Sequence, residues 1–368
     1  MFKNIKIVHK LIVMVIIPIL ALLYFALTGI AEKWRFTGEM ERLRDLSVLA
    51  VKVSGFVHES QKERGATGVF MGSKGTKYAE ELRTQRSNTD KKMEALEDFI
   101  KGFDRGSLDT AFKNDLELGL NNLNGIGSHR NSVNALSISG GEGVGYYTDM
   151  NASFLKVIDH ISRISTNPEL SVQISAYVNL LRTKEKAGIE RAVMSNTFGV
   201  GRFEEGVFNK FISAVNGQDI YLSQFLSFAV SEQREFYKNK MQGEFIDETA
   251  RMRKIALEKA SQGNLGVDSA HWFTMMTGKI NLLKEVEDRL SRDINTKADQ
   301  LKRGANLGLT LLLIVTLASL AAAVFLTYFL MRSITKPLYE MVQVVERISG
   351  GDLTVEIKAS GNDEIGSL

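Results

Sequence analysis

Residues 11–30 read LIVMVIIPILALLYFALTGI and residues 307–331 read LGLTLLLIVTLASLAAAVFLTYFLM, and neither stretch contains a charged residue. At about 1.5 Å of rise per residue, each stretch forms a helix of roughly 30 Å or more, which matches the hydrocarbon core of a bilayer. The sequence therefore predicts two transmembrane helices, over residues 11–30 and 305–331.

Basic residues flank the two predicted transmembrane helices on the sides that face the chain ends. These residues are Lys3, Lys6, Lys10, Arg332 and Lys336. Basic flanks favour the cytoplasmic side of a membrane, whereas long translocated domains largely escape this rule. We therefore expect residues 1–10 and 332–368 to be cytoplasmic and residues 31–304 to form an extracytoplasmic domain.

A cleaved signal peptide is the alternative for the first apolar stretch, because lysines also precede signal sequences. However, the uncharged run of residues 11–30 is longer than the usual apolar region of a signal peptide, and AEKWRF at residues 31–36 offers no obvious cleavage site between small residues. We expect an uncleaved anchor.

The composition excludes several classes of protein. The 368 residues include 46 Lys and Arg against 43 Asp and Glu, so the chain lacks the pervasive basic field of a nucleic-acid-binding protein. The absence of cysteine excludes disulfides and thiolate metal sites. With 44% hydrophobic residues and only three prolines, the chain is expected to build a sizeable core from long helices.

Between the two predicted spans, apolar residues recur every three or four positions, which is the period of amphipathic helices. One stripe comprises Leu43, Leu46, Ala50, Val53 and Val57, and another comprises Ile280, Leu283, Val286, Leu290, Ile294, Ala298 and Leu301. Patches rich in Gly, Asn and Asp predict breaks at 72–76, 101–109, 139–145, 167–168, 198–201, 216–219 and 262–269. We expect an all-α domain of about eight helices in two stacked four-helix bundles, with one elongated bundle as the alternative.

Two similar segments, QKERGATGVF at residues 61–70 and GIERAVMSNTF at residues 188–198, each place a Glu-Arg pair inside a predicted helix. Continuing the apolar stripes along these helices places Arg64 and Arg191 on core faces. A buried guanidinium is costly unless it is hydrogen-bonded or paired, so each arginine needs a partner.

Two interpretations of these arginines remain open from the residues alone. Each guanidinium could form a structural ion pair with an acid, either the preceding glutamate or one across the bundle; the candidates are Glu63, Glu190, Glu59 and Glu185. Alternatively, two planar guanidinium groups could bind a small planar oxyanion through parallel N–H pairs. Gly65, Gly68 and Gly188 nearby would leave room for a small cavity.

The sequence gives no support for catalysis, a cofactor or a metal. The histidines, including His58, His129, His160 and His271, show no metal-binding spacing, and no nucleophile elbow or phosphate loop is present. We interpret His271-Trp272-Phe273 as packing at a helix start, with the aromatic wall of a pocket as the alternative. The chain is not expected to be an enzyme.

The segments FVHESQKERGATGVF and LRTKEKAGIERAVMSNTF resemble the NIT family, the nitrate- and nitrite-sensing domain of bacterial receptors and regulators. The resemblance covers about residues 38–300. It implies a helical domain in which Arg64 and Arg191 hold nitrate or nitrite, with Glu63, Gly65, Glu190 and Ala192 as the surrounding motif. A third basic group from a later helix is expected in the family, and RMRK at residues 251–254 supplies the candidates Arg251 and Arg253.

The segment after the second predicted span resembles the HAMP module, a dimeric parallel four-helix relay. The residues that carry the resemblance are Ile334-Thr335-Lys336-Pro337-Leu338, Gly350-Gly351-Asp352-Leu353 and Asp363-Glu364-Ile365-Gly366. From these we expect Pro337, Gly351, Asp352, Leu353, Glu364 and Gly366 to act in signal relay. Pro337 should lie in the first turn of a helix that GGD ends, where its missing N–H costs little. Residues 332–368 would then be a truncated HAMP module whose output domain lies beyond Leu368.

Both resemblances imply a two-pass receptor of the bacterial inner membrane, similar to methyl-accepting chemotaxis proteins, that works as a homodimer. The apolar seam Ile334, Leu338, Met341, Val345 and Ile348 is of the kind that a partner helix covers. An anion bound in a periplasmic domain would change the packing of the last helix and signal to cytoplasmic partners. The alternatives are the sensor half of a histidine kinase or a cyclic-dinucleotide enzyme, and a helical membrane scaffold that binds no ligand.

Overall fold

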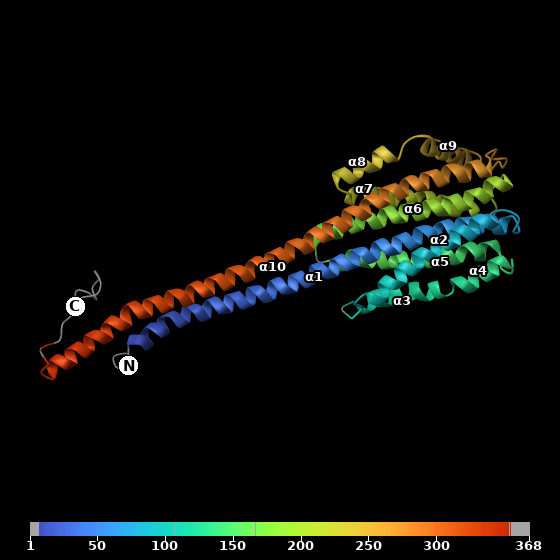
Figure 1. Ribbon diagram of the computed structural model, residues 1–368. Coiled ribbons are helices and arrows are strands. Elements are labelled where there is room, and N and C mark those ends of the chain that lie inside the picture. Colours follow the sequence, from blue (N-terminus) through green and yellow to red (C-terminus); the bar gives the residue numbers. More distant parts are fainter. Residues whose placement is uncertain (1–6, 107, 166, 353, 355–368) are drawn as a thin grey trace. The chain divides into compact units, whose positions relative to one another are not determined.

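The computed structural model describes residues 7–352, apart from 107 and 166, together with 354 (Figure 1). Within these residues the secondary structure is helical, with no strand, which confirms the all-α prediction. The helices are α1 (Ile7–Gly72), α2 (Ala79–Gly102), α3 (Thr110–Asn124), α4 (Ile126–Asn134), α5 (Gly140–Ile164), α6 (Pro168–Val200), α7 (Val207–Phe228), α8 (Ser231–Lys240), α9 (Glu244–Glu258) and α10 (Ser269–Ser349). Residues 41–301 form one compact unit, and the flanking segments form a second.

The unit of residues 41–301 contains the two expected four-helix bundles (Figure 1). The first is built from α1, α2, the broken pair α3 and α4, and α5; the second repeats this order with α6, α7, the broken pair α8 and α9, and α10. The bundles pack side by side through α1 and α6, with Arg64 of α1 bound to Glu185 of α6. The apolar stripes predicted from the sequence are buried, including Val53, Leu283 and Leu290.

Local sequence explains where most of the helices begin and end. The side chain of Asn167 accepts a hydrogen bond from Leu170 N at 2.9 Å, and Pro168 follows it at the start of α6, where a missing N–H costs little. At the other end of α6, Gly201 takes the left-handed conformation, φ 79°, that favours glycine. The breaks predicted at 167–168 and 198–201 are therefore present.

One predicted break is displaced, and another is wrong because the helix continues through it. SGGEGVG at 139–145 begins a helix, because Ser139 and Glu142 form a capping box at the start of α5. NGQD at 216–219 lies inside α7, where tertiary contacts outweigh the weak helix propensity of these residues. Gln218 Nε2 donates to the buried Glu190 carboxylate at 2.6 Å, and Gly217 lies against the side chain of Lys186.

The flanking unit contains the N-terminal part of α1 and the C-terminal part of α10. Both helices include a window that is long and apolar enough to cross a membrane, with mean hydropathies of 2.8 and 2.6. The helix start expected at Pro337 is wrong, because α10 continues through this proline to Ser349. The cost is one backbone hydrogen bond and some strain against the preceding turn.

The helix ends at the predicted glycine pair. Gly351 has φ 96°, and Asp352 N donates to Arg347 O at 3.1 Å, so this end has the bonding pattern of a left-handed glycine cap. Leu353, Glu364 and Gly366 lie outside the described residues.

Candidate functional site

The two Glu-Arg pairs lie next to each other where α1 packs against α6. Each arginine crosses the other helix at a glycine: a Cβ on Gly65 would lie 2.6 Å from Arg191 Nη2, and a Cβ on Gly188 would lie 2.8 Å from Arg64 Nη2. Arg64 is 3% exposed and Arg191 is 6% exposed. The small residues in both motifs are therefore required by the close approach of the two guanidinium groups.

The two glutamates point away from this contact, each into its own bundle. Glu63 accepts from Arg130 at 2.7 and 2.9 Å and from the Tyr147 hydroxyl at 2.7 Å. Glu190 accepts from Arg253 at 2.7 and 2.6 Å and from Gln218. Both carboxylates are buried and already hold basic groups, so they position α1 and α6 and are not free to contact a ligand.

Arg64 has an acidic partner across the helix interface. Its Nη1 lies 2.5 Å from Glu185 Oε1 and 3.0 Å from Thr148 Oγ1, and Gln61 also donates to Glu185. Because Glu185 neutralises this guanidinium, Arg64 fits the structural ion pair that the sequence left open.

Arg191 has no such partner among the residues that the structure describes. Its Nη1 donates to Thr277 Oγ1 at 2.9 Å, its guanidinium carbon lies 4.7 Å from the centre of the Phe273 ring, and its Nε has no hydrogen-bond partner. Burial, together with the nearby charge of Arg64, lowers the pKa of Arg191 to about 10. A buried cation without a counter-charge is costly, and an anion would relieve that cost.

A cavity of about 300 Å³ adjoins Arg191 and is lined by groups from α1, α2, α6 and α10. Its polar lining includes Arg191, Lys184 and Thr277, and Phe273 and Tyr78 provide aromatic surface. Tyr78 has φ 65°, a conformation that is unusual for a residue with a side chain and that recurs at binding sites. The cavity is large enough for a small anion with a few water molecules.

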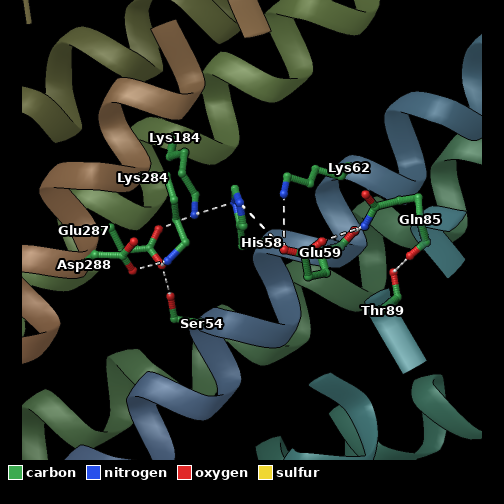
Figure 2. Close-up of polar contacts among 10 residues, drawn as sticks. All are labelled: Ser54, His58, Glu59, Lys62, Gln85, Thr89, Lys184, Lys284, Glu287 and Asp288. Atoms are coloured by element: carbon green, nitrogen blue, oxygen red, sulfur yellow. Dashed lines mark hydrogen bonds and ion pairs between the residues drawn. The ribbon is translucent and has the colours of Figure 1, made fainter. Parts of the chain in front are cut away.

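Lys184, at the edge of this cavity, belongs to a buried charge cluster (Figure 2). It is 1% exposed, forms an ion pair with Glu287 of α10 and contacts His58 Nδ1 of α1 at 3.5 Å. Glu287 also accepts from Ser54 Oγ of α1 at 2.5 Å, and Lys284 Nζ lies 3.1 Å from it. Burial and the charge of Lys184 lower the pKa of His58, which keeps its imidazole neutral. The cluster thus ties α6 to both α1 and α10 beside the cavity.

The structure does not bring the two later arginines to this cavity. Arg251 lies on the exposed face of α9, where its Nη2 pairs with Glu248 at 2.8 Å. Arg253 points into the second bundle and binds Glu190. The packing of α9 in the second bundle keeps both guanidinium groups away from the cavity beside Arg191.

The two interpretations of His271-Trp272-Phe273, packing and the wall of a pocket, apply to different residues of this segment. Trp272 is fully buried, and its indole N–H donates to Arg191 O at 3.1 Å, which is a packing role. Phe273 lines the cavity and stacks against Arg191. Sequence analysis missed Lys184, although the apolar stripe that contains Arg191 places Lys184 seven residues earlier on the same face.

Two family models match the chain. The model described as nitrate and nitrite sensing matches residues 55–295, and the HAMP domain model matches residues 329–368. The HAMP match lies at the end of α10 and in the residues that follow it.

One curated relative is similar to most of the chain, and another is similar to a short part of it. The nitrate regulatory protein of Klebsiella oxytoca is 24% identical over 268 residues, which are 72% of this chain and 66% of that protein. The methyl-accepting chemotaxis protein McpB of Bacillus subtilis is 44% identical over 70 residues, which are 19% of this chain and 11% of that protein. The chain thus spans less than two thirds of the length of either relative.

The solved structure of the NasR transcription antiterminator is similar in fold, with a TM-score of 0.69 at 21% identity over 90% of each chain. The match to the nitrate and nitrite sensing model covers more than half of the chain and includes both Glu-Arg motifs. The chain therefore belongs to the nitrate and nitrite sensing family and carries a HAMP domain at its C-terminal end.

Proposed function

We propose that this chain is the sensor part of a two-pass inner-membrane receptor that binds nitrate or nitrite in the cavity beside Arg191, on the periplasmic side. The observation that carries the proposal is the buried Arg191 guanidinium, which has a hydroxyl, an aromatic ring and a cavity around it but no carboxylate partner in the described part of the chain. A planar guanidinium presents parallel N–H groups that match the edge of a planar oxyanion.

The charge count at the helix crossing supports a monovalent ligand. Arg64 and Arg191 contribute two positive charges, and Glu185 contributes one negative charge. One nitrate or nitrite ion would therefore complete the neutralisation of this buried group. In this proposal Arg191 contacts the anion, Thr277 and Lys184 complete its surroundings, and Arg64 is the neighbouring cation that Glu185 holds in place.

Signal relay is proposed to run through the two helices that leave the sensor domain. The cavity and the charge cluster beside it include residues of α1 and α10, and both helices continue into the candidate membrane spans. An anion shifts their packing only by its differential affinity for two arrangements, typically about 1 to 3 kcal/mol. The HAMP domain would pass this shift on, and the chemotaxis relatives at this end favour a chemotaxis output domain.

The rival proposal is a helical scaffold that binds no ligand. The Arg64–Glu185 ion pair is what such a scaffold would contain, but it accounts for Arg64 and not for Arg191. Isothermal titration calorimetry of the full chain in detergent, with sodium nitrate, sodium nitrite and sodium chloride, separates the two. We expect nitrate or nitrite to bind and Arg191→Ala to weaken binding by at least about a hundredfold, the loss of two charge-assisted hydrogen bonds.

Arg251→Ala is the matched control, because it removes an exposed arginine of the same domain outside the cavity. The Arg251→Ala variant should bind nitrate and nitrite with the same affinity as the wild type. If Arg191→Ala binds nitrate and nitrite as tightly as the wild type does, or if neither ion binds the wild type, the proposed site is wrong.

A further inference from the structure

A second cavity, of about 370 Å³, lies inside the bundle formed by α6–α10. Its lining comes from all five helices and includes the exposed residues Asp219, Lys238 and Ala250, so the cavity is partly open to solvent. Leu222, Met241 and Ile246 form apolar walls, and Arg253 and Lys279 supply positive charge. This volume is within the range of small-molecule sites in proteins.

Of the two part-buried basic groups in this cavity, Arg253 and Lys279, the less satisfied is Lys279. Its Nζ donates to the side-chain oxygen of Gln218 at 3.4 Å. No carboxylate lies within ion-pair distance of this Nζ among the residues that the structure describes. Arg253, by contrast, is paired with Glu190 through two hydrogen bonds. Burial and the charge of Arg253 lower the pKa of Lys279 to about 8.

The first bundle contains a corresponding network in which both cations lie within ion-pair distance of a carboxylate. There Glu63 holds Arg130 and lies 3.6 Å from Arg86, and Arg130 also binds Asp90 of α2 at 2.6 Å. Two cations therefore face two carboxylates, and the Tyr147 hydroxyl donates to Glu63 as well.

In the second bundle the partner from α7 is an amide instead of an acid. Gln218 takes the place that Asp90 has in the first bundle, since it contacts the arginine that holds the buried glutamate. Arg253 is thus paired with Glu190, whereas Asp219, the second acid that lines the cavity, is exposed and forms an ion pair with neither Arg253 nor Lys279 among the described residues. Within the described part of the chain, the Lys279 ammonium therefore has no ion-pair partner, and it lines the cavity.

We propose that this second cavity binds a small organic carboxylate, whose carboxylate group pairs with Lys279 and whose hydrocarbon part lies against Leu222, Met241 and Ile246. The negative charge would complete the network as Asp90 does in the first bundle. The apolar walls and the volume suit a molecule with several carbon atoms better than they suit a bare nitrate ion. This ligand would be separate from the anion beside Arg191.

Thermal unfolding of the full chain in detergent tests the proposal with sodium acetate, butyrate and hexanoate at constant ionic strength. A ligand that binds only the folded state raises the unfolding midpoint, and the rise continues with the logarithm of ligand concentration above the dissociation constant. We expect the midpoint to rise with butyrate or hexanoate more than with acetate. Lys279→Met should weaken this response at least about tenfold in concentration, the loss of one charge-assisted hydrogen bond.

Three further variants make the outcome specific. Ala250→Leu, which adds bulk at the cavity without removing a charge, should also abolish the response. Lys254→Met removes an exposed lysine of α9 that pairs with Glu258, and should leave the response unchanged. Arg191→Ala should keep it too, so failure of the nitrate proposal does not affect this one. An equal response in Lys279→Met and the wild type, or no response to any of the three acids, overturns the proposal.

Discussion

Gly65 and Arg191 show how one missing side chain shapes the proposed site. The Arg191 guanidinium occupies the space in which a Cβ at position 65 would lie. Its neighbour Arg64 occupies the corresponding space at Gly188, but of the two arginines only Arg64 reaches a carboxylate among the described residues. The two arginines thus lie in similar sequence motifs, but Glu185 neutralises the charge of Arg64 and not that of Arg191.

Replacing Gly65 with alanine should displace the Arg191 side chain, because the new Cβ would be 2.6 Å from its Nη2. We expect nitrate affinity to fall about tenfold. The gain of about 0.5–1 kcal/mol from helix propensity should be offset by overpacking of about 1–3 kcal/mol. Calorimetry with nitrate and urea unfolding measure the two effects.

Gly55→Ala on the same helix is the control, because the nearest atom to its Cβ is Lys92 Cδ at 4.0 Å. It should stabilise the fold slightly and leave nitrate affinity unchanged. Equal nitrate affinities in Gly65→Ala and Gly55→Ala would contradict the placement of Arg191 in the binding site.

Lys279 gives a pH dependence with a defined sign. The folded protein holds this proton only up to a pKa of about 8, whereas an unfolded lysine holds it to about 10.5. Between these values the unfolded state binds more protons, so the free energy of unfolding contributed by Lys279 rises with pH. Urea unfolding of the wild type minus that of Lys279→Met should therefore show a positive slope from about pH 8 to 10. A flat or negative difference would be inconsistent with a lysine whose charge is disfavoured by burial.

At the scale of the helices, the charge cluster around Glu287 joins three elements. Lys184 of α6, Ser54 of α1 and Lys284 of α10 all contact this one carboxylate (Figure 2). Lys184 also lines the cavity beside Arg191. A change at the cavity therefore has a direct physical path to the two helices that continue into the candidate spans.

Removing one member of the buried ion pair should cost more than removing both. Glu287→Leu leaves the buried Lys184 ammonium without its counter-charge, which is expected to cost about 3–5 kcal/mol. The double variant Lys184→Met with Glu287→Leu removes both charges and should recover most of that loss. Urea unfolding of the two single variants and the double variant gives the coupling energy. Additive losses would show that Lys184 and Glu287 do not interact as a pair.

The helices themselves were largely predictable, because their stripes and caps are local signals. Asn167-Pro168 and Gly201 ended or began helices as expected, since each satisfies or avoids a backbone group at a helix end. NGQD was misjudged because Gln218 is held by Glu190, which is distant in the chain. The helix propensities of neighbouring residues carry no information about such a long-range contact.

The candidate site was predictable only in part, for the same reason. The phase of the stripes placed Arg64 and Arg191 in the interior, where both are found. Which arginine is neutralised depends on the lateral register of α1 against α6, which sets Arg64 opposite Glu185. Helical period alone does not fix that register, and it likewise left Lys184 and Thr277 unrecognised as cavity residues.

For the whole molecule, the proposed relay requires a partner chain. The HAMP seam of α10 is apolar, and Val345 is 64% exposed and Ile348 is 39% exposed in the single chain. A stripe with a spacing of three and four residues is covered when an equivalent helix packs in parallel against it. We therefore propose a parallel homodimer in which the two seams face each other.

Disulfide cross-linking tests the dimer cleanly, because the sequence contains no cysteine. Val345→Cys places a thiol on the proposed seam, and Gln343→Cys places one on the opposite side of the same helix. In membranes treated with a mild oxidant, Val345→Cys should form dimers faster than Gln343→Cys, since only facing thiols reach disulfide distance. Similar rates for the two variants would rule out this seam as the interface.

The same thiol also reports whether the sensor and the seam are coupled. If occupancy of the Arg191 cavity changes the packing of α10, nitrate should alter the cross-linking rate of Val345→Cys, by at most the factor that its differential affinity allows, about 5- to 150-fold. Adding Arg191→Ala should remove the effect of nitrate while leaving the basal rate in place, because the substitution changes α6 and no residue of the seam. A nitrate effect that survives Arg191→Ala would mean that the anion acts elsewhere, and a double variant with no cross-linking at all would mean that Arg191 stabilises the dimer and does not sense the ligand.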